Sequence, residues 1–448
     1  MDLLDTTVVN VAVPSIRRRL GASLAQVQWM IAGYMLAFGL ALITGGRLGD
    51  LFGRRRVFLA GVAGFTAASL AAGLAPSSEF LIAMRVLQGL GAAVMVPQIL
   101  AIAHTIFPPE ERGKAYGLYG AVTGVAAVVG PILAGTLLAY DPLALGWRAI
   151  FLINVPVGVI ACALAARFVH ESRSEQPGRL DLVGVTLLTV SLLGVLVPLV
   201  EGRELGWPLW MIAIAVASLP LLALFVRHER RLERSGASPL VPLHLFSQRA
   251  FSAGLVACAV FFGTTAGFFM SLTITLQLGL GISALKTGFA LVPFSIAAAV
   301  GSTASASLAK RHGRLVLQYG VVVFAMGLAL LAAVLESRGA RLTMGALLLP
   351  LAASGFGMGL VIAPLVEVIL AGVHNEDAGA ASGVLNATGQ VGQAVGIAVL
   401  GAVYFSALSA PSAASSTHAL ALTLEVAVAI LACCIGVMAL LPKFVDAG

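Results

Sequence analysis

Apolar runs of about 20 residues recur along this whole sequence, separated by short charged or Pro/Gly-rich breaks. A helix of about that length crosses the hydrocarbon core of a bilayer. Hydrophobic residues make up 59% of the chain and charged residues only 10%, so a water-soluble protein of this size would lack the polar surface it needs. The sequence therefore predicts an all-α integral membrane protein.

We expect 14 membrane-spanning helices, at residues 2–16, 26–46, 57–75, 79–104, 113–138, 148–168, 182–200, 209–227, 249–276, 286–309, 315–335, 343–372, 378–408 and 419–441. The first run is short, because about 15 residues cover only about 22 Å of a core about 30 Å thick. We expect this first helix to be truncated at its N-terminus, through a misplaced start codon or trimming. Removal of a signal peptide does not explain it, because no basic n-region or small-residue cleavage site is present.

Basic residues indicate the orientation in the membrane. An even number of spans places both termini on one side, and if that side is cytoplasmic, most lysines and arginines fall in cytoplasmic loops. The cluster 17–19 falls on the outside and conflicts with this rule. The net charge of +7 lies largely in short turns beside the membrane, so we expect contact with anionic lipid headgroups and no nucleic acid. The predicted location is the inner or plasma membrane, with both termini cytoplasmic.

A weak internal repeat suggests two related halves. Leu48, Gly53 and Arg54 in one charged turn match a leucine, a glycine and an arginine at 308, 313 and 314. Both turns follow the second span of a six-span block, as two parallel half-repeats would require. We therefore expect an N-terminal six-helix half at 1–169, a linker with two extra transmembrane helices at 170–248, and a C-terminal six-helix half at 249–448.

Six segments in order closely resemble the fourteen-helix drug:proton antiporter branch of the major facilitator superfamily: LDTTVVNVAVPSI (4–16), GRLGDLFGRRR (46–56), RVLQGLGAAVMVPQ (85–98), PPEERGKAYG (108–117), GVAAVVGPILAG (124–135) and WRAIFLINVPVG (147–158). The stretch 376–401 is similar to the thirteenth helix of that family. The resemblance implies a major facilitator fold arranged 6+2+6, with halves related by a pseudo-twofold axis. It also implies proton-coupled export of amphipathic small molecules, as in multidrug or antibiotic efflux, by alternating access.

Two ionisable residues lie at predicted membrane depth and are candidates for proton coupling. An ionised Asp5 would cost several kcal/mol there unless it faced water or a partner, so its carboxyl is suited to holding and releasing a proton. Arg85 cannot deprotonate, and Gln88 one turn later can share its hydrogen bonds; the family associates this arginine with proton transfer. The alternatives are a solvated Asp5 near the surface and an Arg85 that reaches the interface.

The charged turn is a candidate gate. Gly53 suits a tight turn, and Arg54 and Arg55 can hold lipid headgroups. Asp50 can accept hydrogen bonds at a helix end or pair with a basic residue of the other half, and the resemblance implies that this closes the cytoplasmic side in one state. A purely topological role for the arginines is compatible with gating.

The fifth predicted span carries small residues and a proline at Gly124, Gly130, Pro131 and Gly135. Small residues allow close helix approach, and a proline removes one backbone hydrogen bond and permits bending. Similar sequences are linked with antiport, and a plain packing helix is the alternative.

We assign the substrate cavity to the C-terminal half. Glu367 could bind a cation or a proton or could reach the interface, while Asn386, Gln390 and Gln393 share one face of the thirteenth span. The stretches 249–276 and 286–309 contain no acidic residue, whereas exporters of multivalent lipophilic cations in the branch that this sequence resembles often carry acids in the C-terminal half. This departure from the family pattern disfavours a strictly cationic substrate. Neutral or zwitterionic amphipathic compounds fit as well, held by aromatic contacts from the phenylalanines at 261, 262, 268 and 269, unless these face lipid.

Several other functions lack sequence support. There is no phosphate-binding loop, no Ser/His/Asp arrangement and no metal-spaced Cys/His cluster, so we expect no catalysis, no cofactor and no metal ion. The four cysteines lie within apolar spans and are expected to be buried and unpaired. We expect a monomer. The alternative functions are an exchanger or importer of a specific metabolite on the same fold, and a non-transporting membrane receptor.

Overall fold

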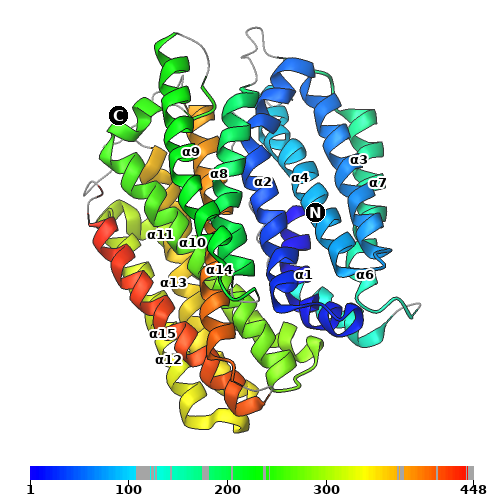
Figure 1. Cartoon of the computed structure of the whole chain (residues 1–448), viewed down its shortest axis with the longest axis vertical. Helices are drawn as coiled ribbons and strands as arrows, with labels where there is room; N and C mark the ends of the chain where they lie inside the picture. The colour runs from blue at the N-terminus through cyan, green and yellow to red at the C-terminus, as the bar shows by residue number, and fades with distance from the viewer. Residues whose placement is uncertain are drawn as a thin grey trace. The chain divides into compact units, whose positions relative to one another are not determined.

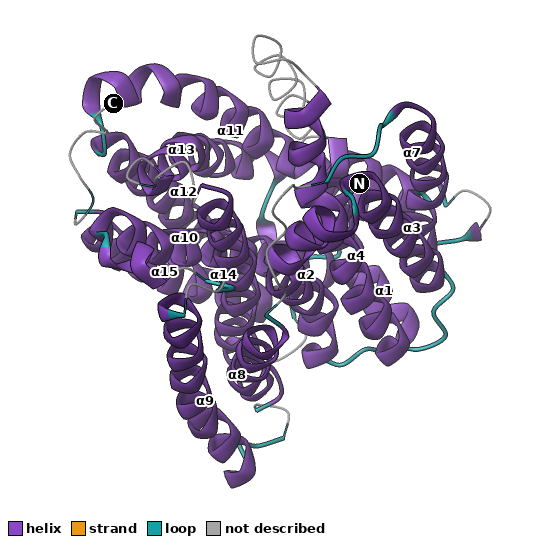
Figure 2. Cartoon of the chain, turned by 90° about the horizontal axis from the view of Figure 1, so that it is seen from above, coloured by secondary structure: helices purple, strands orange, loops and turns teal. Residues whose placement is uncertain are grey.

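A computed structural model describes residues 1–106, 122, 126, 129–141, 144–173, 181–202, 205–235, 239–241, 243–370, 373, 378–409, 412–439 and 441. Within these ranges the regular elements are all helices, and no strand is present (Figure 2). The prediction of an all-α chain is confirmed for the part of the sequence that the structure covers.

Twelve helical segments of the described chain are long and apolar enough to cross a membrane, judged by length and composition. They are α2 (Leu24–Phe52), α3 (Arg54–Gly73), α4 (Ser78–Ile106), α6 with α7 (Arg148–Leu152 and Asn154–Phe168), α8 (Leu182–Glu201), α9 (Leu209–Arg234), α10 (Arg249–Ile274) with the π-helical turn η3 (Thr275–Gly279), α11 (Ala284–His312), α12 (Leu315–Arg338), α13 (Met344–Leu370), α14 (Ala378–Ala407) and α15 (Ala413–Met438). Short 3-10 turns, η2 (Leu243–Ser247) and η4 (Gly339–Arg341), lie between spans. Each of these twelve segments coincides with one predicted span.

The other two predicted spans correspond to α1 (Asp2–Leu20) and to a shorter apolar helix at Val129–Tyr140. The remainder of the fifth predicted span, 113–138, falls largely outside the described residues. α1 continues four residues beyond the predicted end, because its last turn carries three arginines, whose charge suits the C-terminal carbonyls of a helix. Gly21 then ends α1 in a left-handed conformation, with φ of 66°, and its N–H donates to the Arg17 carbonyl.

Side-chain caps explain where several spans begin. Ser23 and Gln26 form a capping box before α2, in which the Ser23 hydroxyl accepts from the Gln26 N–H at 3.2 Å and the Gln26 side chain accepts from the Ser23 N–H at 2.9 Å. Ser412 caps α15 by accepting from the Ser415 N–H. These caps satisfy N–H groups that have no partner in the first helical turn.

The chain divides into two compact units. Unit 1 comprises Met1–Val9, Ser15–Ala126 and Asp141–Leu243. Within it α4 packs between α2 and α3, α7 packs on α3, and α8 packs on α9 and on α2 (Figure 1). The Trp29 indole N–H donates to a Glu201 carboxylate oxygen at 2.8 Å and ties α2 to α8.

Unit 2 comprises Asn10–Pro14, Ala127–Tyr140 and His244–Gly448. Within it α13 packs against α11 and α12, while α10 packs against α14 and α15. Aromatic rings fill its core: Phe261 lies 5.3 Å from Phe324 and Phe269 lies 4.8 Å from Phe294 between ring centroids.

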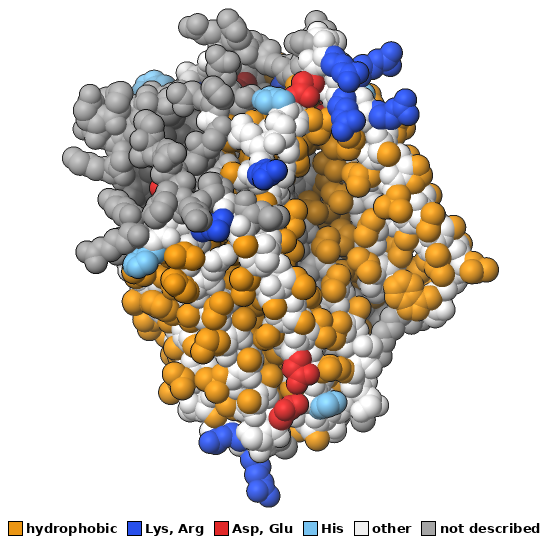
Figure 3. All heavy atoms as spheres, turned by 90° about the vertical axis from the view of Figure 1, so that its left-hand side faces the viewer, with side chains coloured by type: hydrophobic (Ala, Val, Ile, Leu, Met, Phe, Trp, Pro, Cys, Tyr) orange, Lys and Arg blue, Asp and Glu red, His pale blue; other side chains and the backbone are white. Residues whose placement is uncertain are grey.

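The exterior of the spans is apolar. Large hydrophobic side chains such as Leu209, Val216 and Leu219 of α9 are more than half exposed. Figure 3 shows one face on which hydrophobic side chains cover most of the middle, while charged side chains gather toward its upper and lower ends. Lipid tails rather than water suit such a surface.

Candidate functional site

A buried polar network in unit 1 joins α1, α2, α4 and the α6–α7 junction, and Asp5 lies at its centre. The side chains of Asp5, Arg85, Gln88 and Asn154 are all at most 1% exposed. Close packing brings the helices together here: a Cβ at Gly89 of α4 would lie 2.4 Å from the Tyr34 carbonyl oxygen of α2. A glycine at this position therefore lets α4 approach α2 near Arg85.

The Asp5 carboxylate accepts hydrogen bonds from three side chains. Arg85 Nη1 donates to Oδ2 at 2.5 Å, and the Gln88 and Asn154 amides each donate to Oδ1 at 3.0 Å. Arg85 Nη1 also donates to Gln88 Oε1 at 2.9 Å, so the three residues of the predicted proton-coupling set that lie on α1 and α4 form one group. This is the donor arrangement that an ionised carboxylate requires when it is removed from water.

Arg85 has an unusual environment for a charged group. Its guanidinium carbon lies 4.2 Å from the centroid of the Tyr34 ring and 5.9 Å from that of Phe151, and its Nε donates to the Met30 carbonyl at 3.0 Å. Aromatic faces stabilise a cation in a site without water. Nη2 of Arg85 is buried and has no hydrogen-bond partner within the described chain. Arg85 is therefore a core residue of unit 1, and the alternative of an arginine that reaches the interface does not describe it.

Sequence reasoning missed four members of the network. Asn154 donates to Asp5 and also, at 3.1 Å, to the Ser69 hydroxyl, which in turn donates to the Phe151 carbonyl. The Tyr34 hydroxyl donates to an Asp2 carboxylate oxygen. The sequence contained one indication of Asn154, because the segment WRAIFLINVPVG places its amide side chain in an apolar span. α6 ends at Leu152 and α7 begins at Asn154, so this residue lies at a break in the span.

The charged turn is held by its own side chains and by the chain that follows α7. Arg54 pairs with Asp50 at 3.0 Å one helical turn away, and Gly53 has φ of 103°. The Glu171 carboxylate accepts from the N–H groups of Arg55 and Arg56 at 3.1 and 3.3 Å. Glu171 thus caps the start of α3, a contact that the sequence did not predict.

Replacing Glu171 with alanine is expected to loosen the first turn of α3. The variant leaves two N–H groups at the helix start without their acceptor, and loss of such a cap costs about 1 kcal/mol. Hydrogen–deuterium exchange should then accelerate about fivefold at residues 55 and 56 and stay unchanged at the middle of α3. Equal exchange in both proteins would contradict the capping role.

The predicted antiport helix is described in part. Gly124 lies outside the described residues, while Gly130 and Pro131 belong to the helix Val129–Tyr140. Within unit 2 this helix packs tightly on the start of α11: a Cβ at Gly135 would lie 2.6 Å from the Leu285 α-carbon, and one at Gly288 would lie 2.3 Å from the Pro131 carbonyl oxygen. Its small residues therefore make a close helix–helix contact.

Gly135→Val is expected to force these two helices apart. Overpacking of this kind typically costs about 1–3 kcal/mol, so the unfolding midpoint of the detergent-purified protein should fall by several degrees. Gly345→Val is the matched control, because a Cβ at Gly345 meets nothing within 4 Å. Equal midpoints for the two variants would contradict a tight contact at Gly135.

The four predicted cavity residues lie on two helices of unit 2, α13 and α14. Glu367 and Asn386 are exposed, and the Asn386 amide donates to the Ser382 carbonyl of its own helix at 2.9 Å. Gln393 donates to Gln390 at 3.2 Å, so this pair is bonded along α14. Among the four phenylalanines, those at 261 and 268 are fully buried in the aromatic core of unit 2.

Comparisons with known proteins agree with this architecture. The sequence model of the Major Facilitator Superfamily matches residues 1–397. A probable actinorhodin transporter of Streptomyces coelicolor is 42% identical over 416 residues, which cover 93% of this chain and 72% of that protein. A puromycin resistance protein of Streptomyces alboniger is 37% identical over 413 residues, covering 91% and 80%.

Solved structures show the same fold. An auto-inhibited peptide transporter of the POT family superposes with a TM-score of 0.68 at 17% identity, over 98% of this chain and 94% of that one. At this level of identity the likeness concerns the fold alone. The chain is thus a multi-pass, all-helical membrane protein with the architecture of that transporter.

Proposed function

Because the chain belongs to the Major Facilitator Superfamily, we propose that it is a secondary transporter that exports amphipathic small molecules in exchange for protons. Relatives at 42% and 37% identity are named for actinorhodin transport and puromycin resistance, which supports efflux of antibiotic-like compounds. The proton gradient is an adequate energy source, since one elementary charge moving through 100 mV yields about 2.3 kcal/mol.

The observation that carries the proposal is the buried pair of Asp5 and Arg85, 2.5 Å apart and without exposed surface. A proton that binds Asp5 removes its negative charge and leaves Arg85 as an uncompensated cation. Separating the partners of a buried ion pair typically costs about 3–5 kcal/mol. Protonation of Asp5 therefore favours a state in which α1 and α4 have moved relative to each other, which is how a proton can drive a conformational change.

Gln88 and Asn154 have a supporting role in this mechanism. Each donates to the Asp5 oxygen that Arg85 does not contact, so both stabilise the ionised carboxylate and are released by the proton. Loss of the Asn154 hydrogen bond on protonation of Asp5 affects α7, and loss of the Gln88 hydrogen bond affects α4. Coupling thus involves three spans of unit 1 at one carboxylate.

The remaining sequence predictions form the wider proposal. We take the full arrangement to be 14 helices in a 6+2+6 order, with halves at 1–169 and 249–448 joined by the extra pair at 170–248, both termini cytoplasmic, and a monomer bound to anionic headgroups. The twelve described spans, α1 and the helix Val129–Tyr140 support the helix number. Asp50, Gly53, Arg54 and Arg55 would form the cytoplasmic gate.

The substrate path is proposed along α13 and α14. Glu367 and Asn386 are exposed side chains on otherwise apolar helices, and the Gln390–Gln393 pair lies nearby on α14. The helix with Gly130, Pro131 and Gly135 would bend or slide against α11 during transport.

The test is transport in proteoliposomes. Purified protein is reconstituted, a pH gradient is imposed, and movement of actinorhodin and of puromycin is followed by absorbance or mass spectrometry. We expect accumulation on the acidic side, abolished by a protonophore. Accumulation that persists after the gradient is collapsed would contradict proton coupling, and no movement of either compound or of further amphipathic antibiotics would contradict export.

A further inference from the structure

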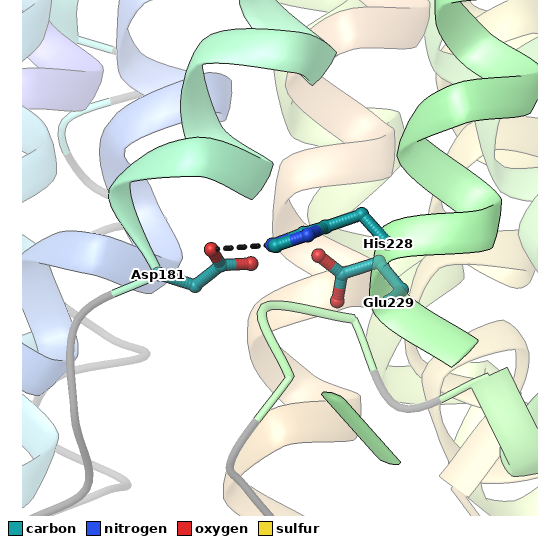
Figure 4. A group of neighbouring side chains, drawn as sticks. All are labelled: Asp181, His228 and Glu229. Carbon is teal, nitrogen blue, oxygen red and sulfur yellow. Dashed lines mark hydrogen bonds and ion pairs between the residues drawn. The ribbon is translucent and has the colours of Figure 1, made fainter. Parts of the chain in front are cut away.

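A second cluster of ionisable side chains lies outside the Asp5 network, where the two helices α8 and α9 meet the loops beside them. Asp181 precedes α8 and caps it, accepting from the Gly184 N–H at 2.9 Å. His228 and Glu229 lie in the last two turns of α9. Figure 4 shows the three side chains converging from the two helices, all within unit 1.

The hydrogen bonds in this cluster use only half of the available oxygens. His228 Nε2 lies 2.9 Å from Asp181 Oδ1, and Glu229 Oε2 accepts from the Val241 N–H at 2.9 Å. The other two oxygens, Asp181 Oδ2 and Glu229 Oε1, are buried and have no hydrogen-bond partner among the described residues. A buried carboxylate oxygen without a donor is costly, so these two oxygens favour a metal cation or a shared proton between them.

Position and burial show that these two oxygens face the same point. A Cβ built at Gly184 would lie 2.1 Å from Asp181 Oδ2 and 2.5 Å from Glu229 Oε1, so both oxygens approach one small space beside this glycine. Glu229 is fully buried, and the Asp181 side chain is only 7% exposed. His228, at 23% exposed, is the most exposed member of the cluster.

We propose that Asp181, His228 and Glu229 bind a divalent transition-metal ion of the zinc class. One ligand atom from each residue lies within 4.8 Å of the other two, which small side-chain movements reduce to the spacing around an ion with bonds of about 2.0–2.2 Å. An imidazole nitrogen with two carboxylate oxygens favours Zn²⁺ over Mg²⁺ or Ca²⁺, which prefer oxygen ligands alone. His228 takes part as the neutral tautomer, with its proton on Nδ1 and the Nε2 lone pair on the metal.

The ion would join the start of α8 to the end of α9 and to the loop at Val241. That loop also contacts the charged turn, because Arg47 donates to the Pro239 carbonyl at 3.0 Å. By holding Glu229, which accepts from the Val241 N–H, the metal also positions the nearby Pro239 carbonyl, which is the acceptor for Arg47. This gives the two extra helices a structural role that does not depend on substrate or protons.

Direct metal analysis tests the proposal. The full chain is purified with a tag that lacks histidines, stripped with a chelator, reloaded with Zn²⁺ and dialysed; bound zinc is measured by mass spectrometry and affinity by competition with a chromophoric chelator. We expect one zinc per chain, an affinity lower by about tenfold or more in His228→Asn and in Glu229→Gln, and wild-type binding in the controls His170→Asn and Glu233→Gln. Zn²⁺ should also raise the unfolding midpoint of wild type and not of His228→Asn.

The variant His228→Asn keeps the Asp181 cap and the bond from Val241 to Glu229, so it is expected to fold and to report on metal binding itself. Cobalt gives an independent readout, since Co²⁺ in this site should show visible absorption that His228→Asn lacks. Equal zinc content and affinity in His228→Asn and wild type would overturn the proposal. So would a wild-type protein that binds no zinc and instead shows, by infrared spectroscopy, a protonated carboxylic acid that Glu229→Gln removes.

Discussion

Replacing Asp5 with asparagine is expected to abolish substrate-driven proton release. Asparagine has nearly the same shape and can still accept from Gln88 and Asn154, but it cannot hold or release a proton. In weakly buffered detergent solution, adding actinorhodin or puromycin to the wild type should acidify the medium, as a pH-sensitive dye reports. With Asp5→Asn the signal should fall to background while the compound still binds.

Asp141→Asn is the matched control for this experiment. Asp141 accepts from the Gly146 N–H in a loop, and its hydrogen bonds within the described part of the chain do not involve the Asp5 network. Its variant should release protons like the wild type. Proton release of wild-type size from Asp5→Asn would place the coupling carboxyl elsewhere, and equal loss in both variants would indicate general damage and contradict a specific role for Asp5.

Replacing Arg85 has the second large effect. Arg85→Met leaves Asp5 buried without its cation, and breaking such a pair by removing one partner costs about 3–5 kcal/mol. The unfolding midpoint of the detergent-purified protein should therefore fall by several degrees. The double variant Asp5→Asn with Arg85→Met should be more stable than Arg85→Met alone, because it contains no uncompensated charge.

Arg85→Lys separates charge from geometry. A lysine keeps the positive charge but cannot donate at once to Asp5, Gln88 and the Met30 carbonyl as the planar guanidinium does. We expect transport to fall by about tenfold or more with a smaller loss of stability than in Arg85→Met. Arg148→Lys is the control, since the Arg148 guanidinium donates to the Ala75 carbonyl and lies over the Trp147 ring, outside the group around Asp5. Additive effects in the double variant, or full transport with Arg85→Lys, would contradict the ion-pair mechanism.

The helices were predictable from sequence because the membrane leaves few choices. An apolar run of about 20 residues bounded by charges must form a helix in lipid, and the twelve described spans match that rule. The end of α1 was set too early, at 16 instead of 20, since arginines at 17–19 read as a loop. In the structure they complete the last turn, where their charge is favourable.

The site was predictable only where its members share a motif or a helix. The sequence marks Asp5, Arg85 and Gln88 because they are polar residues within apolar runs. They also lie in segments that resemble those of a known family. Their partners Asn154, Ser69 and Tyr34 come from three other helices, and no local spacing connects them. The same holds for Asp181 and His228, which lie far apart in sequence and meet only because α8 and α9 pack together.

The bond between Arg47 and Pro239 bears on how this protein could be shortened. An engineer who excised residues 181–241, which contain α8, α9 and the loop after α9, would remove the carbonyl that receives this guanidinium. The Glu201 acceptor of Trp29 on the same helix, α2, would be lost with it. A minimal version would need two replacement acceptors for α2 at opposite ends of the deleted pair. In design terms α8, α9 and the loop after α9 support α2 at two points, and any trimmed scaffold has to replace both contacts.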